Sequence, residues 1–197
     1  IPLENVTAVY DHHVGFEEYW ASRIGDNAKI EFIGAAATLI YREWEKAGLE
    51  HRMSRLAARL LIAAILDNTL NLTSSNTTTE DVAVFQALCA HADADREWCA
   101  AYFSEVQAGV EADLQNALRN DTKNVRDNPV LPPKVAQLCV WDAESILRRL
   151  PEIRGWFEGA WLLNIIDMQN RCSWFVCDDD TYQEKIGRLF GVPFENG

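Results

Sequence analysis

The sequence predicts an α/β protein, because strand-like and helix-like segments alternate along the chain. Short runs rich in apolar, β-branched and aromatic residues predict strands at 6–10, 135–141, 161–167 and 173–177. Segments with apolar residues at helical spacing predict helices at 34–46, 52–66, 143–159 and 181–190. Glycine, proline and aspartate lie between several of these segments and favour turns.

Two further helices and one loop are predicted in the middle of the chain. Thr77 and Glu80 have the spacing of a capping box, which predicts the start of a helix that continues to about residue 91. Another helix is predicted over 95–118. The segment 124–134 contains three prolines and several charged residues, and therefore predicts a loop.

Composition limits the classes of function. The chain has 197 residues, 48% of them hydrophobic, which is enough for one large domain or two small ones. A formal net charge of −12 argues against a broad nucleic-acid surface. No run of 18 uninterrupted apolar residues predicts a membrane span. Five cysteines without tight ligand spacing are typical of reduced thiols, so we expect a cytoplasmic protein. From the charge and the lack of a long apolar run we expect neither nucleic-acid nor membrane partners.

The tripeptide Asp11-His12-His13 is the strongest candidate for a functional site. It directly follows the predicted strand at 6–10, and open α/β sheets bind ligands at the carboxyl ends of their strands. Imidazole and carboxylate groups together suit a divalent transition metal such as Mn, Co or Zn. The tripeptide therefore predicts a metal site at the end of this strand.

A second candidate, Asp67, directly follows the predicted helix at 52–66. The apolar positions of this helix suggest that it lies mostly inside the protein: Leu56, Leu60, Leu61, Ala64 and Ile65. A carboxylate in apolar surroundings is costly unless it is paired, hydrogen-bonded or bound to a metal. The alternative is that Asp67 caps the turn at Asn68 and Thr69, since aspartate is a common turn residue.

Four segments resemble motifs of one family. Residues 10–13, 33–41 and 63–70 resemble, in order and spacing, the later motifs of DHH-superfamily phosphoesterases. Residues 118–123 resemble the Asp-x-Lys segment that opens the DHHA2-type second domain of manganese-dependent inorganic pyrophosphatases and related exopolyphosphatases. The resemblance implies a partial DHH domain, a parallel sheet flanked by helices, over residues 1–108. A smaller α/β DHHA2-type substrate-binding domain would follow over residues 109–197.

The resemblance also implies a metal centre. His12 and Asp67 would be ligands of the same divalent metal, with Mn²⁺ preferred and Mg²⁺ or Co²⁺ as alternatives. Asp11 would orient the two histidines by hydrogen bonding. In this family paired cations activate a water molecule and neutralise the phosphoryl oxygens.

Three residues would contact the substrate by the same resemblance. His13 would face the phosphate or donate a proton to the leaving oxygen, which suits a group that titrates near neutrality. Lys123 would reach a substrate phosphate from the second domain. Thr38 matches a phosphate-side position at the start of a helix. A plain structural role for Thr38 in the first turn of the helix is the alternative.

The resemblance implies metal-dependent hydrolysis of a phosphoanhydride. It is also compatible with a homodimer. The tryptophan-rich second domain favours an exopolyphosphatase acting on polyphosphate, with pyrophosphatase activity as the alternative. The family's first metal-binding motifs are not found ahead of the strand at 6–10, so we expect this polypeptide alone to be poorly active or inactive. A non-catalytic binding or scaffold protein that keeps the fold is the alternative from another class.

Overall fold

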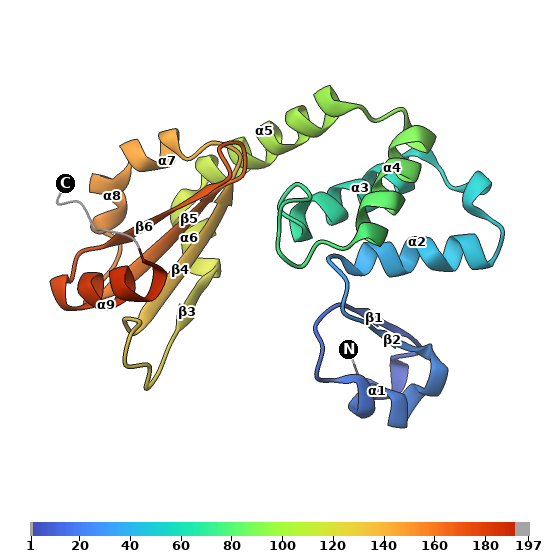
Figure 1. The fold of residues 1–197 in the computed structure, drawn as a ribbon, viewed down its shortest axis with the longest axis horizontal. Helices are drawn as coiled ribbons and strands as arrows, with labels where there is room; N and C mark the ends of the chain where they lie inside the picture. Colours follow the sequence, from blue (N-terminus) through green and yellow to red (C-terminus); the bar gives the residue numbers. More distant parts are fainter. Residues whose placement is uncertain (1, 192–197) are drawn as a thin grey trace. The chain divides into compact units, whose positions relative to one another are not determined.

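Strands and helices alternate along the chain, as the sequence predicts, and form a mixed α/β fold (Figure 1). The computed structural model describes residues 2–191. These residues fall into two units that divide between Ala100 and Ala101, inside helix α5. The predicted domain boundary at 108/109 lies eight residues farther along the chain and stays a prediction. Within 2–191, no helix is both long and apolar enough to cross a membrane.

The first unit contains a two-stranded parallel sheet and a group of three packed helices. Its elements are η1 Leu3–Asn5, β1 Val9–Asp11, α1 Glu17–Ile24, η2 Gly25–Asn27, β2 Ala28–Ile30, α2 Ala36–Lys46, η3 Glu50–Arg52, α3 Arg55–Asn68 and α4 Thr79–Ala92. In the sheet, Tyr10 pairs with Lys29 and Asp11 with Ile30. Helices α2, α3 and α4 contact one another, as Figure 1 shows. Strand β1, at Val9–Asp11, is shorter than the strand predicted at 6–10 and lies farther along the chain.

The buried carboxylate of Asp81 joins α4 to the segment before α2. Its oxygens accept hydrogen bonds from the backbone N–H groups of Gly34, at 2.9 Å, and Ala35, at 3.2 Å. Gly34 is required by this close approach, because a Cβ atom there would lie 2.6 Å from Asp81 Oδ2. The hydrogen bonds therefore fix how the chain enters α2.

The capping box of α4 is formed by Thr78 and Asp81, so the predicted pair Thr77 and Glu80 is wrong by one residue. Thr78 Oγ1 accepts from the backbone N–H of Asp81, and Asp81 Oδ2 accepts from the backbone N–H of Thr78. Glu80 instead forms an ion pair with Arg42. The shift has a physical reason, since only Asp81 points inward and reaches the segment before α2.

The prediction for the inward face of α3 is correct for Ile65, which is buried, but wrong for Leu56 and Leu60. Leu56 and Leu60 are 68% and 63% exposed. The residues of α3 that are buried are Ala58, Ile62, Ile65 and Leu66. These positions face α2 and α4, whereas the apolar stripe through Leu56 and Leu60 lies on another side of the same helix.

The second unit is built on a four-stranded mixed sheet with the order β3-β4-β5-β6. Strands β4 and β5 are parallel, and the two outer pairs are antiparallel. Its elements are the end of α5 Arg96–Ala112, α6 Leu114–Asn120, β3 Thr122–Asn124, β4 Lys134–Val140, α7 Glu144–Arg148, α8 Leu150–Arg154, β5 Trp161–Asp167, β6 Cys172–Cys177 and α9 Asp180–Phe190.

Helices cover both faces of this sheet. Leu118 of α6, Ile146 of α7 and Ile153 of α8 belong to the core that includes Ala136 and Leu163 of the central strands. On the other face, Ile186 of α9 packs with Leu162 and with Val135. Neighbouring residues of β4 and β5 thus belong to opposite cores, as the alternation of side chains in strands requires.

Two predicted helices are each divided in two. The predicted helix at 95–118 ends at Ala112, and Asp113 then caps α6 through the backbone N–H of Asn116. The predicted helix at 143–159 is divided at Arg149, with Pro151 in the first turn of α8. Proline lacks the N–H that a continuous helix needs, which explains the second division.

Candidate metal centre

Asp11, His12 and His13 lie together at the carboxyl end of β1. One potential ligand atom from each residue lies within 4.8 Å of the other two. The imidazole rings meet edge to face, with centroids 4.3 Å apart and an interplanar angle of 64°. Strand β1 ends at Asp11, so the two histidines leave the sheet where ligand sites of α/β proteins are found.

Asp11 holds both histidines in place. Its Oδ1 accepts hydrogen bonds from the backbone N–H groups of His12, at 2.7 Å, and His13, at 3.1 Å. The same oxygen lies 2.8 Å from His13 Nδ1. Because an ionised carboxylate can only accept a hydrogen bond, Nδ1 of His13 carries the proton. The other ring nitrogen, Nε2, takes no part in this contact.

These contacts keep Asp11 ionised. Partial burial disfavours the charged carboxylate and would raise its pKa. The hydrogen bonds from the His13 ring and from the backbone of His13 and His12 outweigh this effect, so the pKa of Asp11 lies below its ordinary value. The site therefore presents an anionic oxygen beside two imidazoles, one of which, that of His13, is 73% exposed.

The donor set fits a divalent transition metal. Two atoms bound to one ion, with bonds of about 2.1 Å, lie at most about 4.2 Å apart, so ligand atoms that lie within 4.8 Å of one another need only small side-chain movements to share an ion. Imidazole nitrogens and carboxylate oxygens suit Mn, Co and Zn alike. A group of this size leaves coordination positions for further protein ligands, for water or for a substrate oxygen, as catalytic sites require.

Asp67 lies in the last turn of α3, and its side chain is exposed, in contrast to the apolar surroundings predicted for it. The inward positions of this turn are occupied by Ile65 and Leu66. Among residues 2–191, the compact group of candidate ligands contains Asp11, His12 and His13 but not Asp67. A role of Asp67 as metal ligand stays a prediction.

The chain immediately after Asp67 has an unusual backbone. Leu70, Asn71 and Leu72 have φ angles of 49°, 56° and 62°, a conformation that β-carbon sterics disfavour. Thr69 supports the turn, because its hydroxyl donates to the carbonyl of Ile65 at 2.6 Å and accepts from the N–H of Leu72 at 3.1 Å. Sparsely populated backbone conformations of this kind cluster at functional sites.

The structure places Thr38 in the core. Its side chain is fully buried, and its hydroxyl donates a 2.6 Å hydrogen bond to Asp81. The hydroxyl is not directed to solvent, so the structure does not support the predicted contact with phosphate. The geometry agrees with the alternative, a structural role of Thr38 in the first turn of the helix. Sequence reasoning missed Asp81, although Thr78-x-x-Asp81 matches the capping-box pattern as well as Thr77-x-x-Glu80 does.

Lys123 lies in β3 of the second unit. Its side chain is exposed, and its ammonium group lies 3.9 Å from Asp121 Oδ1. An exposed ion pair at this distance is weak, so the lysine is available to an anionic ligand. Its predicted contact with a substrate phosphate stays a prediction.

Comparison with known proteins identifies relatives of one kind, although no family model matches the chain. A Listeria monocytogenes (serotype 4b, strain CLIP80459) protein named "Probable manganese-dependent inorganic pyrophosphatase" is 28% identical over 194 residues. A Listeria welshimeri protein of the same name is 27% identical over 194 residues. Each match covers 94% of this chain and 58% of the relative. The chain thus spans less than two thirds of the relatives' length.

A solved structure has the same fold. The Methanococcus jannaschii "putative family II inorganic pyrophosphatase" superposes with a TM-score of 0.66 and 19% sequence identity. The superposition covers 99% of this chain and 67% of the other. The fold is shared. The mixed α/β architecture predicted from the sequence is confirmed by this likeness.

Proposed function

We propose that this chain carries part of the metal centre of a manganese-dependent hydrolase that acts on inorganic pyrophosphate. The observation that carries the proposal is the compact group of Asp11, His12 and His13 at the carboxyl end of β1. The relatives, named as manganese-dependent inorganic pyrophosphatases, support both the metal and the substrate.

In this proposal His12 and Asp67 hold the divalent metal. When bound, the metal lowers the pKa of water and neutralises charge on phosphoryl oxygens. Asp11 keeps the proton on His13 Nδ1 through the 2.8 Å contact and so presents Nε2 towards the substrate. His13, when protonated, donates a proton to the leaving phosphate, and Lys123 supplies a positive charge to a substrate oxygen.

The names of the relatives favour pyrophosphate over polyphosphate as the substrate. The prediction of an exopolyphosphatase depends on the tryptophan content of the second domain. Several of these rings have structural contacts: Trp161 is buried against Phe157, and Trp141 stacks on Phe103. Tryptophan content therefore does not favour the longer substrate.

The test measures phosphate release by the endogenous protein, after its intact mass has been recorded. Pyrophosphate and long-chain polyphosphate are compared with Mn²⁺, Mg²⁺, Co²⁺ and no metal. We expect Mn²⁺-dependent release from pyrophosphate and slower release from polyphosphate. If neither substrate releases phosphate with any of these metals, the proposal is contradicted. The result would then favour the alternative, a non-catalytic binding protein that keeps the fold.

Matched histidine variants locate the activity. His12→Gln should weaken Mn²⁺ binding, and His13→Gln should lower kcat by about 100-fold, the typical effect of losing a positioned proton donor. His51→Gln is the control, because His51 is exposed and lies in η3, away from the candidate metal centre in sequence. Equal losses in all three variants would contradict the assignment of the site.

A further inference from the structure

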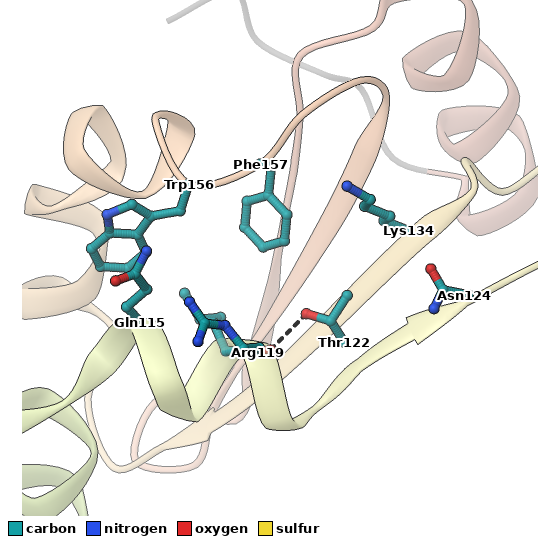
Figure 2. Close-up of a pocket in the computed structure, with 8 residues that line it drawn as sticks. Gln115, Arg119, Thr122, Asn124, Lys134, Trp156 and Phe157 are labelled. Atoms are coloured by element: carbon teal, nitrogen blue, oxygen red, sulfur yellow. Dashed lines mark hydrogen bonds between the residues drawn. The ribbon is translucent and has the colours of Figure 1, made fainter.

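A pocket of about 170 Å³ lies in the second unit, apart in sequence from the candidate metal centre. It is bounded by α6, by the neighbouring strands β3 and β4, and by the segment that follows α8 (Figure 2). Figure 2 shows the Phe157 ring between Trp156 and Lys134, with Arg119 on the side of α6. The walls thus combine aromatic rings with cationic side chains.

The pocket and Lys123 lie on opposite faces of β3. Thr122 and Asn124 line the pocket, and side chains of a strand alternate between its faces. The register agrees, because Asn124 pairs with Lys134, which also lines the pocket, whereas Lys123 pairs with Val135, which packs in the core beneath α9. The pocket is therefore distinct from the predicted substrate lysine.

The charge of the pocket contrasts with that of the chain. Among residues 2–191, those that line it include Arg119 and Lys134 and no carboxylate, although the formal net charge is −12. Within the same described range, the Arg119 guanidinium has no hydrogen-bond or ion-pair partner. Lys134 Nζ donates to the carbonyl of Glu158 at 3.1 Å, which leaves its charge uncompensated. Such a cavity attracts an anion.

One ring of the aromatic wall, that of Phe157, is anchored on the core. Phe157 stacks on Trp161, with centroids 4.8 Å apart and an interplanar angle of 18°, and Trp161 is buried in the core. Trp156 lies two residues after the end of α8 and is half-buried. Planar faces of this kind favour a ring in the ligand, through offset or edge-on stacking.

We propose that this pocket binds a small anionic molecule that carries a planar ring, of the chemical class of aryl and heteroaryl phosphates. The phosphate would be held by Arg119, whose fork of donors matches two phosphate oxygens, and by the charge of Lys134. The ring would pack against Trp156 and Phe157. The volume lies below the usual 300 Å³ or more of drug-sized sites, so the ligand is small.

The test is a titration of the whole chain, labelled with ¹⁵N at its seven tryptophan side chains, followed by NMR. Trp156→Phe identifies the signal of Trp156. Three matched probes separate the contributions: phenyl phosphate carries ring and charge, inorganic phosphate the charge alone, and benzyl alcohol the ring alone. Phenyl phosphate should shift the Trp156 signal and bind at least about tenfold more tightly than either of the others. No shift of Trp156 up to about 10 mM phenyl phosphate would overturn the proposal.

Three variants test the geometry with the same probe. Arg119→Gln should weaken phenyl phosphate binding by about tenfold or more and leave benzyl alcohol unaffected. Arg126→Gln is the control, since Arg126 is an exposed arginine in the loop between β3 and β4. Lys123→Gln should also bind phenyl phosphate normally, because Lys123 lies on the other face of β3. Normal binding by Arg119→Gln, or weak binding by Lys123→Gln, would place the ligand elsewhere and overturn the proposal.

Discussion

The hydroxyl of Thr38 donates a 2.6 Å hydrogen bond to Asp81, 43 residues farther along the chain. The contact joins the first turn of α2 to the first turn of α4. Asp81 also accepts from the backbone N–H groups of Gly34 and Ala35 and from the N–H and hydroxyl of Thr78. One buried carboxylate thus satisfies the polar groups where two helices begin.

Asp81→Ala should therefore destabilise the protein strongly. The change leaves several buried donors without an acceptor, and each such loss costs about 1–3 kcal/mol, so the free energy of unfolding should fall by at least about 3 kcal/mol. Urea denaturation measures this loss. Glu80→Ala is the matched control, since its ion pair with Arg42 is partly exposed and should contribute less than about 1 kcal/mol. Similar losses in both variants would contradict the role of Asp81.

The stabilisation by Asp81 should depend on pH. Burial would raise the pKa of Asp81, but hydrogen bonds from Thr38, Thr78 and Gly34 outweigh it and hold the pKa below the ordinary value of 3.8. The contribution is therefore fully present above pH 3.8 and is lost as the pH falls through the lower pKa of the folded state. The difference in unfolding free energy between the protein and Asp81→Asn should shrink in this acidic range. A constant difference would contradict the prediction.

Substitutions at Thr38 separate its structural role from the predicted phosphate contact. Thr38→Val removes the hydroxyl without changing the shape, so the unfolding free energy should fall by about 1–3 kcal/mol. Thr38→Ser keeps the hydroxyl and should recover most of this loss. If Thr38→Val instead left stability unchanged and raised the KM for pyrophosphate, the phosphate contact would be supported.

The two sides of α3 should respond differently to truncation. Ile62 is fully buried, whereas Leu60 is 63% exposed. Ile62→Ala should cost about 2–5 kcal/mol, because it leaves a cavity in the core. Leu60→Ala removes a side chain of similar size and should change stability by about 0.5 kcal/mol or less. Thermal and urea unfolding of the pair test the orientation of the helix, and a larger loss for Leu60→Ala would contradict it.

Asp11→Asn tests how the carboxylate positions the histidines. The variant keeps the shape of the side chain but loses the charge that accepts from the backbone N–H of His12, the proposed metal ligand, at 2.7 Å and from His13 Nδ1 at 2.8 Å. Mn²⁺ affinity, measured by calorimetry, should fall by about 10- to 100-fold, the usual effect of removing a partner that orients a metal-binding histidine. Asp26→Asn, an exposed change in η2, should leave the affinity unchanged. Unchanged affinity in Asp11→Asn would contradict the role.

The sequence was most informative where a single local signal decides the structure. Strand β5 has the predicted bounds, 161–167, because a run that is apolar at five of its seven positions and mostly buried on both faces has few alternatives. Helix α9 begins one residue before its predicted start, where Asp179 caps it through the N–H groups of Thr181 and Tyr182. The group of Asp11, His12 and His13 was equally accessible, since neighbours in sequence are neighbours in space.

Tertiary contacts decided the features that the sequence could not predict. Leu56 and Leu60 are as apolar as the buried residues of α3, so helical spacing alone cannot select the inward face. The predicted capping pair and the real one differ by one residue, and the contacts of Asp81 with Gly34, Ala35 and Thr38 distinguish them. Strand β3 has three residues, which is too short for a periodic signal, and its pairing with β4 defines it. The proposed roles of Asp67 and Lys123 likewise depend on groups distant in sequence.

The alternation of side chains in β3 has a consequence for insertions and deletions. Inserting one residue between α6 and β3 would shift the register with β4 by one position. Lys123 would then turn towards the aromatic pocket, and Thr122 and Asn124 would turn towards the face covered by α9. A two-residue insertion would restore the original faces. Sequences that share this strand should therefore tolerate length changes at this junction in steps of two.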